Sequence, residues 1–183
     1  DKLLGGDLRP LMQTTRGCPF SCTFCQEGAD YYNKVRRFSL DRVKSEILYL
    51  ARHSKSKTLS VADSNFGMYK QDIDICKEIA SSMKTHNWPL ALEGIQGKNK
   101  KERVLEATSI IGHTSYSAAI QSTDKNVLKE IKRANVSGEA MLDVVKEAKR
   151  KTQSTSFSEL ILGLPGDSKK GHFQSNIDLL DSE

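Results

Sequence analysis

Short apolar segments alternate with longer segments of helical periodicity, and this alternation constrains the fold more than any other feature of the chain. Five apolar segments have the length and composition of strands, at residues 11–15, 58–62, 89–95, 115–120 and 159–164. Alternation of this kind is typical of successive βα units, whose strands pair in a mainly parallel sheet. The sequence therefore predicts an α/β protein.

The segments between these strands have the spacing of amphipathic helices. After Ser39, which suits an N-cap, apolar residues share one helical face as far as Ala51. The same periodicity runs from Ile73 to Met83 and includes Cys76. Further helices are expected over residues 100–109, 124–133 and 138–151, and through an apolar face formed by Phe173, Ile177 and Leu180.

The number of units predicts a partial barrel. A complete eight-unit (β/α) barrel takes about 250 residues, whereas this chain has 183. We expect a TIM-like partial (β/α) barrel of about five to six units, truncated at its C-terminus. The chain opens with Asp1 rather than Met, so residues 1–183 are taken as one core domain of a longer polypeptide. In such folds ligands bind at the carboxyl ends of the strands.

Composition excludes several classes of protein. Hydrophobic residues make up 37% and charged residues 28% of the chain, which suits a globular domain rather than a disordered one. We expect neither a signal peptide nor a membrane span, since no apolar run approaches the roughly 18 residues that a span needs. The net charge of +5 comes from dispersed lysines, so nothing beyond charge supports a nucleic-acid partner. Closely spaced cysteines favour a reducing cytoplasm over a secreted disulfide framework.

The cysteines suggest an inorganic centre. Cys18, Cys22 and Cys25 place three thiols within eight positions, directly after the first expected strand. Three thiolates suit zinc, copper(I) or an iron–sulfur cluster, and most simple clusters use four cysteines. A cluster held by three would keep one iron open to another ligand. The fourth cysteine, Cys76, lies on an apolar helical face and is expected to be a buried thiol.

The cysteine segment resembles the hallmark of the radical S-adenosylmethionine (SAM) enzymes, CxxxCxxC with an aromatic residue, here Phe24, before the last cysteine. The resemblance continues through Gln-Ser-Thr-Asp at 121–124 and Leu-Gly-Leu-Pro-Gly-Asp at 162–167, and covers essentially the whole chain. It implies a [4Fe-4S] cluster on Cys18, Cys22 and Cys25, with the amino and carboxylate groups of SAM on the fourth iron. One electron would then cleave SAM to methionine and a 5′-deoxyadenosyl radical.

The resemblance also implies a set of SAM-binding residues, while assigning no catalytic side chain. The adenine would lie against Phe24, Leu162 and Gly163, the amino group near Asp63 and Ser64, and the ribose or carboxylate against Gln121 and Ser122. Many members carry Gly-Gly-Glu where this chain has Asp63-Ser64-Asn65. The residues also allow plainer roles: Phe24 as core, Asp63 in turn or helix capping, Ser122 as a helix cap, and Gly163 in an ordinary strand.

The expected activity is that of an oxidoreductase or transferase acting on an unknown substrate by hydrogen abstraction or by methyl or alkyl transfer. An electron donor such as flavodoxin or ferredoxin is the expected partner. The segments look most like members with an upstream cobalamin-binding domain, which implies cobalamin as a further cofactor outside this chain. Two alternatives stay open: a tRNA methylthiotransferase, and a zinc or electron-transfer module in which His113 or Cys76 completes a four-ligand site.

Overall fold

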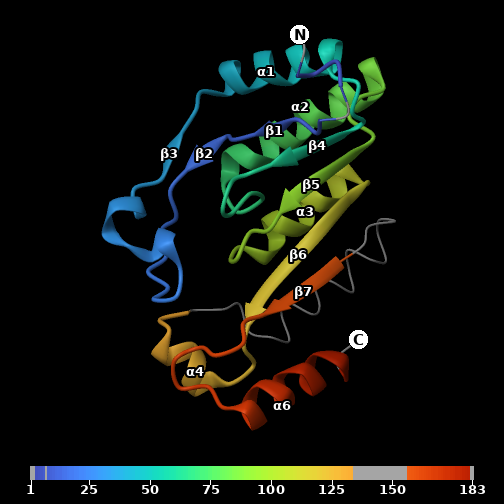
Figure 1. Cartoon of the computed structure of the whole chain (residues 1–183). Helices are drawn as coiled ribbons and strands as arrows, with labels where there is room; N and C mark the ends of the chain where they lie inside the picture. The colour runs from blue at the N-terminus through green and yellow to red at the C-terminus, as the bar shows by residue number, and fades with distance from the viewer. Residues whose placement is uncertain (1–2, 7, 134–155, 182–183) are drawn as a thin grey trace.

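A parallel sheet of five strands forms the framework of the computed structural model, which describes residues 3–6, 8–133 and 156–181. Its strands follow one another in the order β1 (Leu11–Met12), β4 (Thr58–Val61), β5 (Ala91–Ile95), β6 (Thr114–Gln121) and β7 (Ser156–Leu160). Every neighbouring pair is parallel. The strands form an open arc with α1, α2 and α3 on one side (Figure 1). This confirms the expected partial (β/α) barrel.

The first two helices form where the sequence predicts them. Helix α1 spans Leu40–His53, and the side chain of Ser39 caps it by accepting a hydrogen bond from the backbone N–H of Arg42. Its predicted apolar face buries Val43 and Ile47 against the sheet. Helix α2 spans Lys70–His86. The next two helices are α3 (Lys101–Ile111) and α4 (Lys125–Glu130), so both predictions are confirmed within a few residues.

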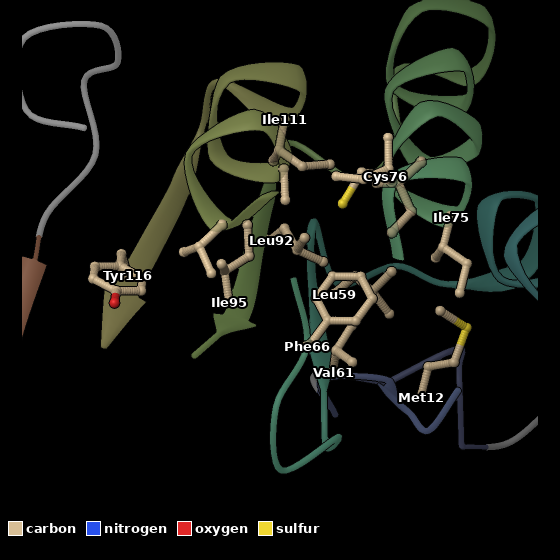
Figure 2. Close-up of a cluster of buried hydrophobic side chains, with 14 of the residues drawn as sticks. Met12, Leu59, Val61, Phe66, Ile75, Cys76, Leu92, Ile95, Ile111 and Tyr116 are labelled. Atoms are coloured by element: carbon tan, nitrogen blue, oxygen red, sulfur yellow. The ribbon is translucent and has the colours of Figure 1, made fainter. Parts of the chain in front are cut away.

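The hydrophobic core lies between the sheet and these helices. Figure 2 shows its central side chains, which include Leu59, Leu92, Ile95 and Tyr116 from the strands. Cys76 points from α2 into this core and is 0% exposed. Burial raises the pKa of the Cys76 thiol far above its usual range. Cys76 is therefore the buried thiol that the helical pattern predicts.

The prediction of a first strand over 11–15 is only half right. Leu11 and Met12 join the main sheet, but Thr15 and Arg16 form a separate strand, β2 (Thr15–Arg16). Strand β2 pairs antiparallel with β3 (Arg36–Arg37) in a two-stranded ribbon. The chain changes partners here because both threonines at 14 and 15 bond to Asp63 at the end of β4. The sequence pattern contains no signal for this long-range contact.

The last predicted strand is displaced. Residues 159–164 were expected to form it, but β7 ends at Leu160, after which the chain turns. Gly163 allows this turn because its φ of 80° lies in the left-handed region. Phe157 of β7 is 51% exposed, so the expected burial on both faces is not found within the described residues. The predicted helix over 138–151 lies outside those residues.

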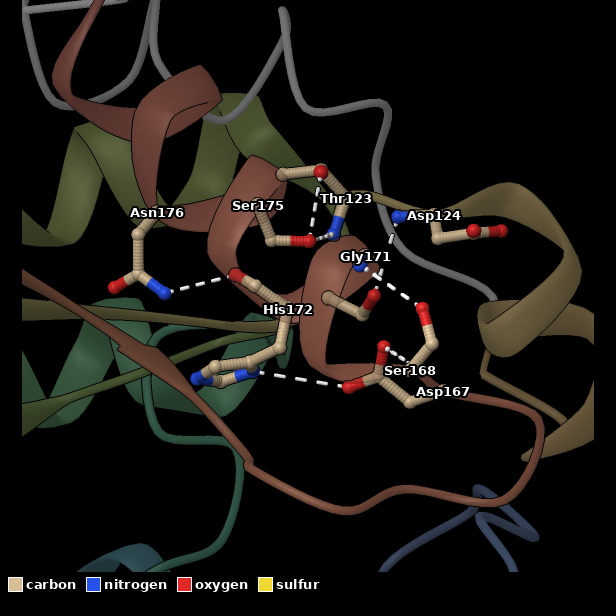
Figure 3. Close-up of polar contacts among 9 residues, drawn as sticks. Thr123, Asp124, Asp167, Ser168, Gly171, His172, Ser175 and Asn176 are labelled. Carbon is tan, nitrogen blue, oxygen red and sulfur yellow. Dashed lines mark hydrogen bonds and ion pairs between the residues drawn. The ribbon is translucent and has the colours of Figure 1, made fainter.

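The final helix, α6 (Lys169–Leu180), also differs from its expected packing. Phe173 and Leu180 were placed on a buried face, yet they are 67% and 72% exposed. Polar contacts instead join α6 to the segment after β6, where Thr123 bonds to Ser175 at 3.0 Å (Figure 3). Thr123 also bonds to Asp178 at 2.7 Å. Across the described ranges, no helix combines the length and apolar character needed to cross a bilayer.

Candidate functional site

A cavity of 520 Å³ lies at the carboxyl ends of the strands, as the fold class predicts. The cysteine loop forms one wall with Cys18, Cys22 and Cys25. The loops after β4 and β5, the ends of β6 and β7 and the segment after α4 (Lys125–Glu130) supply the remaining wall, with Ser64, Gln96, Lys98, Ala119, Gln121, Arg133, Glu159 and Ile161. The cavity therefore collects side chains from segments that are distant in sequence.

Backbone hydrogen bonds shape the cysteine loop, residues 17–35. The ribbon of β2 and β3 closes its base, and two short 3₁₀ turns, η1 (Gln26–Gly28) and η2 (Asp30–Tyr32), complete it. The N–H of Cys18 donates to the carbonyl of Tyr32 at 2.9 Å, and that of Cys25 donates to Cys22 at 3.2 Å. A Cβ atom on Gly28 would lie 2.0 Å from the Cys22 carbonyl oxygen, so only glycine fits this turn.

All three loop cysteines are free thiols. Cys18 and Cys22 are buried, and Cys25 is half-buried. In the described part of the chain, no three His, Cys, Asp or Glu side chains are grouped closely enough to hold a single metal ion. In an iron–sulfur cluster each cysteine binds a different iron, whereas the ligands of a mononuclear zinc site share one ion.

The two residues proposed as a fourth zinc ligand are elsewhere. Cys76 lies in the core behind the sheet, and His113 is an exposed residue directly before β6, at the amino end of that strand. The cysteine loop lies at the opposite, carboxyl end of the strands. Neither Cys76 nor His113 is therefore placed to complete a zinc site with the loop cysteines.

Two buried side chains donate hydrogen bonds to loop thiols. The Asn65 amide nitrogen lies 3.3 Å from the Cys18 sulfur. The Arg133 guanidinium lies 3.8 Å from the Cys22 sulfur and donates to the carbonyl of Ala119 at 2.6 Å. Donors facing sulfur suit thiolates, which only accept, so these residues fit a metal-bound cluster.

Sequence reasoning did not single out these two donors. Asn65 belongs to the Asp-Ser-Asn segment that was already a candidate, and its position at a strand end was the available signal. Arg133 lies just beyond α4, where a basic residue is readily explained by its favourable interaction with the helix dipole. Only the tertiary structure brings it back to the cysteines.

Phe24 takes part both in the cavity and in a small apolar cluster. It lines the cavity and packs against Val127, Ile131 and Leu164. Nearby, the backbone N–H of Thr23 donates to the carbonyl of Ile131 at 3.0 Å. This backbone hydrogen bond and the Phe24 side chain therefore both fix the cysteine loop to the end of α4.

Ser64 and Gln121 also reach the cavity, as expected for SAM-binding residues. The hydroxyl of Ser64 donates to the carboxylate of Glu27 in the cysteine loop. Gln121 is buried at the end of β6, with a left-handed φ of 72°. These positions are compatible with the predicted contacts to SAM, which stay predictions.

Asp63, Ser122, Leu162 and Gly163 do not line this cavity. The buried carboxylate of Asp63 accepts hydrogen bonds from the backbone and hydroxyl of Thr14 and from the hydroxyl of Thr15. Ser122 accepts from the backbone N–H of Asp124 at 3.1 Å, but the side chain that caps α4 is that of Asp124, so the capping role weighed for Ser122 is not found. Leu162 is 74% exposed. Within the described residues, no atom lies within 4 Å of a Cβ built on Gly163, and the expected approach of the adenine to this residue stays a prediction.

Behind the cavity, burial perturbs two groups near the start of α2. The carboxylate of Asp72 accepts from the backbone N–H groups of Gly67 at 2.8 Å and Tyr69 at 2.9 Å. Burial raises the pKa of Asp72 to about 6, although these hydrogen bonds oppose the shift. Burial, followed by negative charge at Cys18, raises the pKa of Tyr69 to about 12. Burial therefore makes the ionised form of Asp72 less favourable in the folded protein than in the unfolded chain.

Comparison with known proteins agrees with this site. The Radical SAM superfamily model matches residues 12–174. The chain is 34% identical over 173 residues to the 2-(S-pantetheinyl)-carbapenam-3-carboxylate methyltransferase of Streptantibioticus cattleyicolor, covering 90% of this chain and 25% of that protein. It is 32% identical over 165 residues to the cobalamin-dependent radical SAM methyltransferase TokK of Streptomyces tokunonensis, covering 85% of this chain and 23% of TokK.

A solved structure shows the same fold. The radical SAM methyltransferase TsrM of Kitasatospora setae, bound to tryptophan and the SAM analog aza-SAM, superposes with a TM-score of 0.79 at 17% identity. The match covers 98% of this chain and 35% of TsrM. The chain spans about a quarter of the length of the two curated relatives.

Proposed function

The chain belongs to the radical SAM superfamily, and we propose that it forms the cluster-binding and SAM-binding core of a cobalamin-dependent methyltransferase. The observation that carries this proposal is the cavity at the strand ends, which three free thiols line together with polar side chains from five other segments. The family relationship gives the cofactors, and the residues that line the cavity support the proposal that this chain holds them.

Cys18, Cys22 and Cys25 would hold the [4Fe-4S] cluster, and the polar wall of the cavity would hold SAM. When bound, the cluster supplies the single electron that SAM cleavage requires. Arg133 offers a buried guanidinium beside Cys22, which suits the carboxylate of SAM. Gln121 and Ser64 offer amide and hydroxyl groups for the ribose or the amino group. Phe24 supplies an apolar surface for the adenine.

Methyl transfer is the preferred reaction because both curated relatives above 30% identity are methyltransferases. One of them is cobalamin-dependent by name, which supports cobalamin as a further cofactor of the whole protein. We prefer the assignment as a methyltransferase to that as a tRNA methylthiotransferase, because the net positive charge is the one feature that supports the latter. The substrate, an electron donor of the flavodoxin or ferredoxin type and a cytoplasmic location belong to the same proposal, since free thiol ligands need a reducing compartment.

The experiment is reconstitution of the full-length protein with iron, sulfide and cobalamin under anaerobic conditions, followed by SAM and a strong reductant. We expect S-adenosylhomocysteine, which methyl transfer from SAM leaves behind, and 5′-deoxyadenosine, which reductive cleavage produces. The Cys22→Ala variant is expected to yield no 5′-deoxyadenosine. A protein that binds iron and SAM but forms only 5′-deoxyadenosine would contradict methyl transfer while leaving the radical SAM assignment intact.

A further inference from the structure

We propose that Asn65 is a positioning residue that raises the reduction potential of the cluster by donating a hydrogen bond to Cys18. This inference rests on the proposed cluster and goes beyond it, because it assigns a role to a side chain that is not a ligand. The Asn65 amide nitrogen lies 3.3 Å from the Cys18 sulfur, well within the range of an N–H to sulfur contact.

Burial strengthens this contact. Asn65 is 2% exposed and Cys18 is 3% exposed, so water does not compete for the sulfur. A hydrogen bond is electrostatically stronger in such a low-dielectric setting than at the surface. The donor is also neutral, so its burial needs no compensating charge.

The surrounding loop holds Asn65 in place from both sides. On one side Asp63 is tied to Thr14, and its backbone carbonyl accepts from the side chain of Gln96 at 3.0 Å. On the other side the carbonyl of Asn65 accepts from the N–H of Met68 at 3.1 Å. Asn65 itself lies between these anchors. Its side chain therefore meets the sulfur without a large loss of conformational freedom when a cluster binds.

Packing alone does not explain an asparagine at this position. Among the residues that the structure describes, its buried Oδ1 has no hydrogen-bond partner, which is unfavourable for a polar atom. A leucine or valine would avoid this penalty if the position served packing alone. A thiolate bound to iron accepts and cannot donate, so the reversed amide would set oxygen against sulfur. An asparagine at this position is explained if its N–H group faces the cluster ligand.

The direction of the effect follows from electrostatics. Reduction adds an electron to the cluster and increases the negative charge on its cysteine sulfurs. A hydrogen-bond donor stabilises the more negative state more strongly, so it favours reduction. Hydrogen bonds to sulfur are one of the factors that set cluster potentials. Removing the Asn65 donor should therefore make the cluster harder to reduce.

The test compares Asn65→Leu and Asn65→Ala with the wild type and with Asn176→Leu, which removes an exposed amide on α6. Each full-length protein is reconstituted anaerobically without SAM, and its potential is measured by EPR-monitored redox titration. At a fixed ambient potential, both Asn65 variants should show about a tenfold lower ratio of reduced to oxidised cluster, equivalent to about 59 mV for one electron. Asn176→Leu should match the wild type.

An unchanged potential in a cluster-loaded Asn65 variant would overturn the inference and leave the proposed function untouched. A wild type that assembles no cluster would instead overturn the proposed function. If neither Asn65 variant assembles a cluster, a measurement on the wild-type protein tests the hydrogen bond instead. Pulsed EPR of its reduced cluster, with ¹⁵N in the asparagine side-chain amides, should show a ¹⁵N hyperfine coupling, and its absence would overturn the inference.

Discussion

The backbone N–H of Thr14 donates a 2.7 Å hydrogen bond to the carboxylate of Asp63, joining the start of the cysteine segment to the end of β4. The hydroxyls of Thr14 and Thr15 donate to the same carboxylate. Asp63 is 0% exposed. The acidic residue at this strand end is thus occupied with holding two segments together.

The Asp63→Asn substitution should destabilise the cluster-free protein by about 1–3 kcal/mol. An amide has one accepting oxygen where the carboxylate has two, so at least one buried donor loses its partner. Urea denaturation measures the change, with Asp74→Asn on the exposed side of α2 as the control. A loss of stability no larger than that of the control would show that the threonine contacts do not stabilise the fold.

The Cys22→Ala substitution should abolish cluster assembly, whereas Cys76→Ala should retain it. Cys22 lines the cavity, but Cys76 lies in the core behind the sheet. Iron and sulfide analysis after anaerobic reconstitution, together with the brown colour of the product, measures the difference. Loss of iron in the Cys76 variant with full iron in the Cys22 variant would reverse the assignment of ligands.

The Arg133→Lys substitution should weaken SAM binding about tenfold while leaving the iron content unchanged. Lysine keeps the positive charge but loses the planar fork that can hold the Ala119 carbonyl and a carboxylate together. Equilibrium binding of SAM to the reconstituted protein measures the effect. Arg103→Lys is the matched control, because Arg103 also donates to a backbone carbonyl, that of Met68. Equal affinity for SAM in the Arg133→Lys and Arg103→Lys variants would show that Arg133 does not bind SAM.

Asp72 should make the stability of the cluster-free protein depend on pH between about 4 and 6. Its pKa rises from 3.8 to about 6 on folding, so the folded protein holds a proton that the unfolded chain releases. This contribution is fully present below pH 4 and is lost as the pH rises through 6. At about 1.4 kcal/mol per pKa unit, the effect is of order 3 kcal/mol.

Denaturation at pH 4 and pH 7 tests this expectation. Relative to the wild type, Asp72→Asn should be more stable at pH 7 than at pH 4, because asparagine does not ionise. The control is Asp74→Asn, whose stability relative to the wild type should change little over the same interval. A pH-independent difference between Asp72→Asn and the wild type would contradict the raised pKa.

The sequence predicted those elements whose signal is local. Ser39 predicted the start of α1, and the apolar spacing around Ile73 and Cys76 predicted α2, because helix faces and caps are determined within a few residues. The boundaries of β1 and β7 were wrong because partner choice decides them. Thr15 has the propensity to form a strand in the main sheet or in the two-stranded ribbon. Its contacts with Arg37 and Asp63 are long-range, and the periodicity of the sequence does not predict them.

The site divides in the same way. The spacing of the three cysteines, with Phe24, pointed to the cofactor directly, and the strand-end rule predicted that Ser64 and Gln121 would reach the same cavity. Whether Asp63 faces the cavity or Thr14 depends on the direction of one side chain, which the sequence does not specify. Arg133 reaches Cys22 across 111 positions of the chain, and only the packing of α4 against the cysteine loop brings them together.

The most direct test of the central claim is EPR of the anaerobically reconstituted and reduced protein, recorded before and after addition of SAM. The account predicts about four irons per chain, a brown protein, and a reduced-cluster signal that SAM changes by binding to the open iron. The Cys22→Ala variant should give no such signal. A colourless protein that holds zinc, gains no iron and shows no response to SAM would contradict the account.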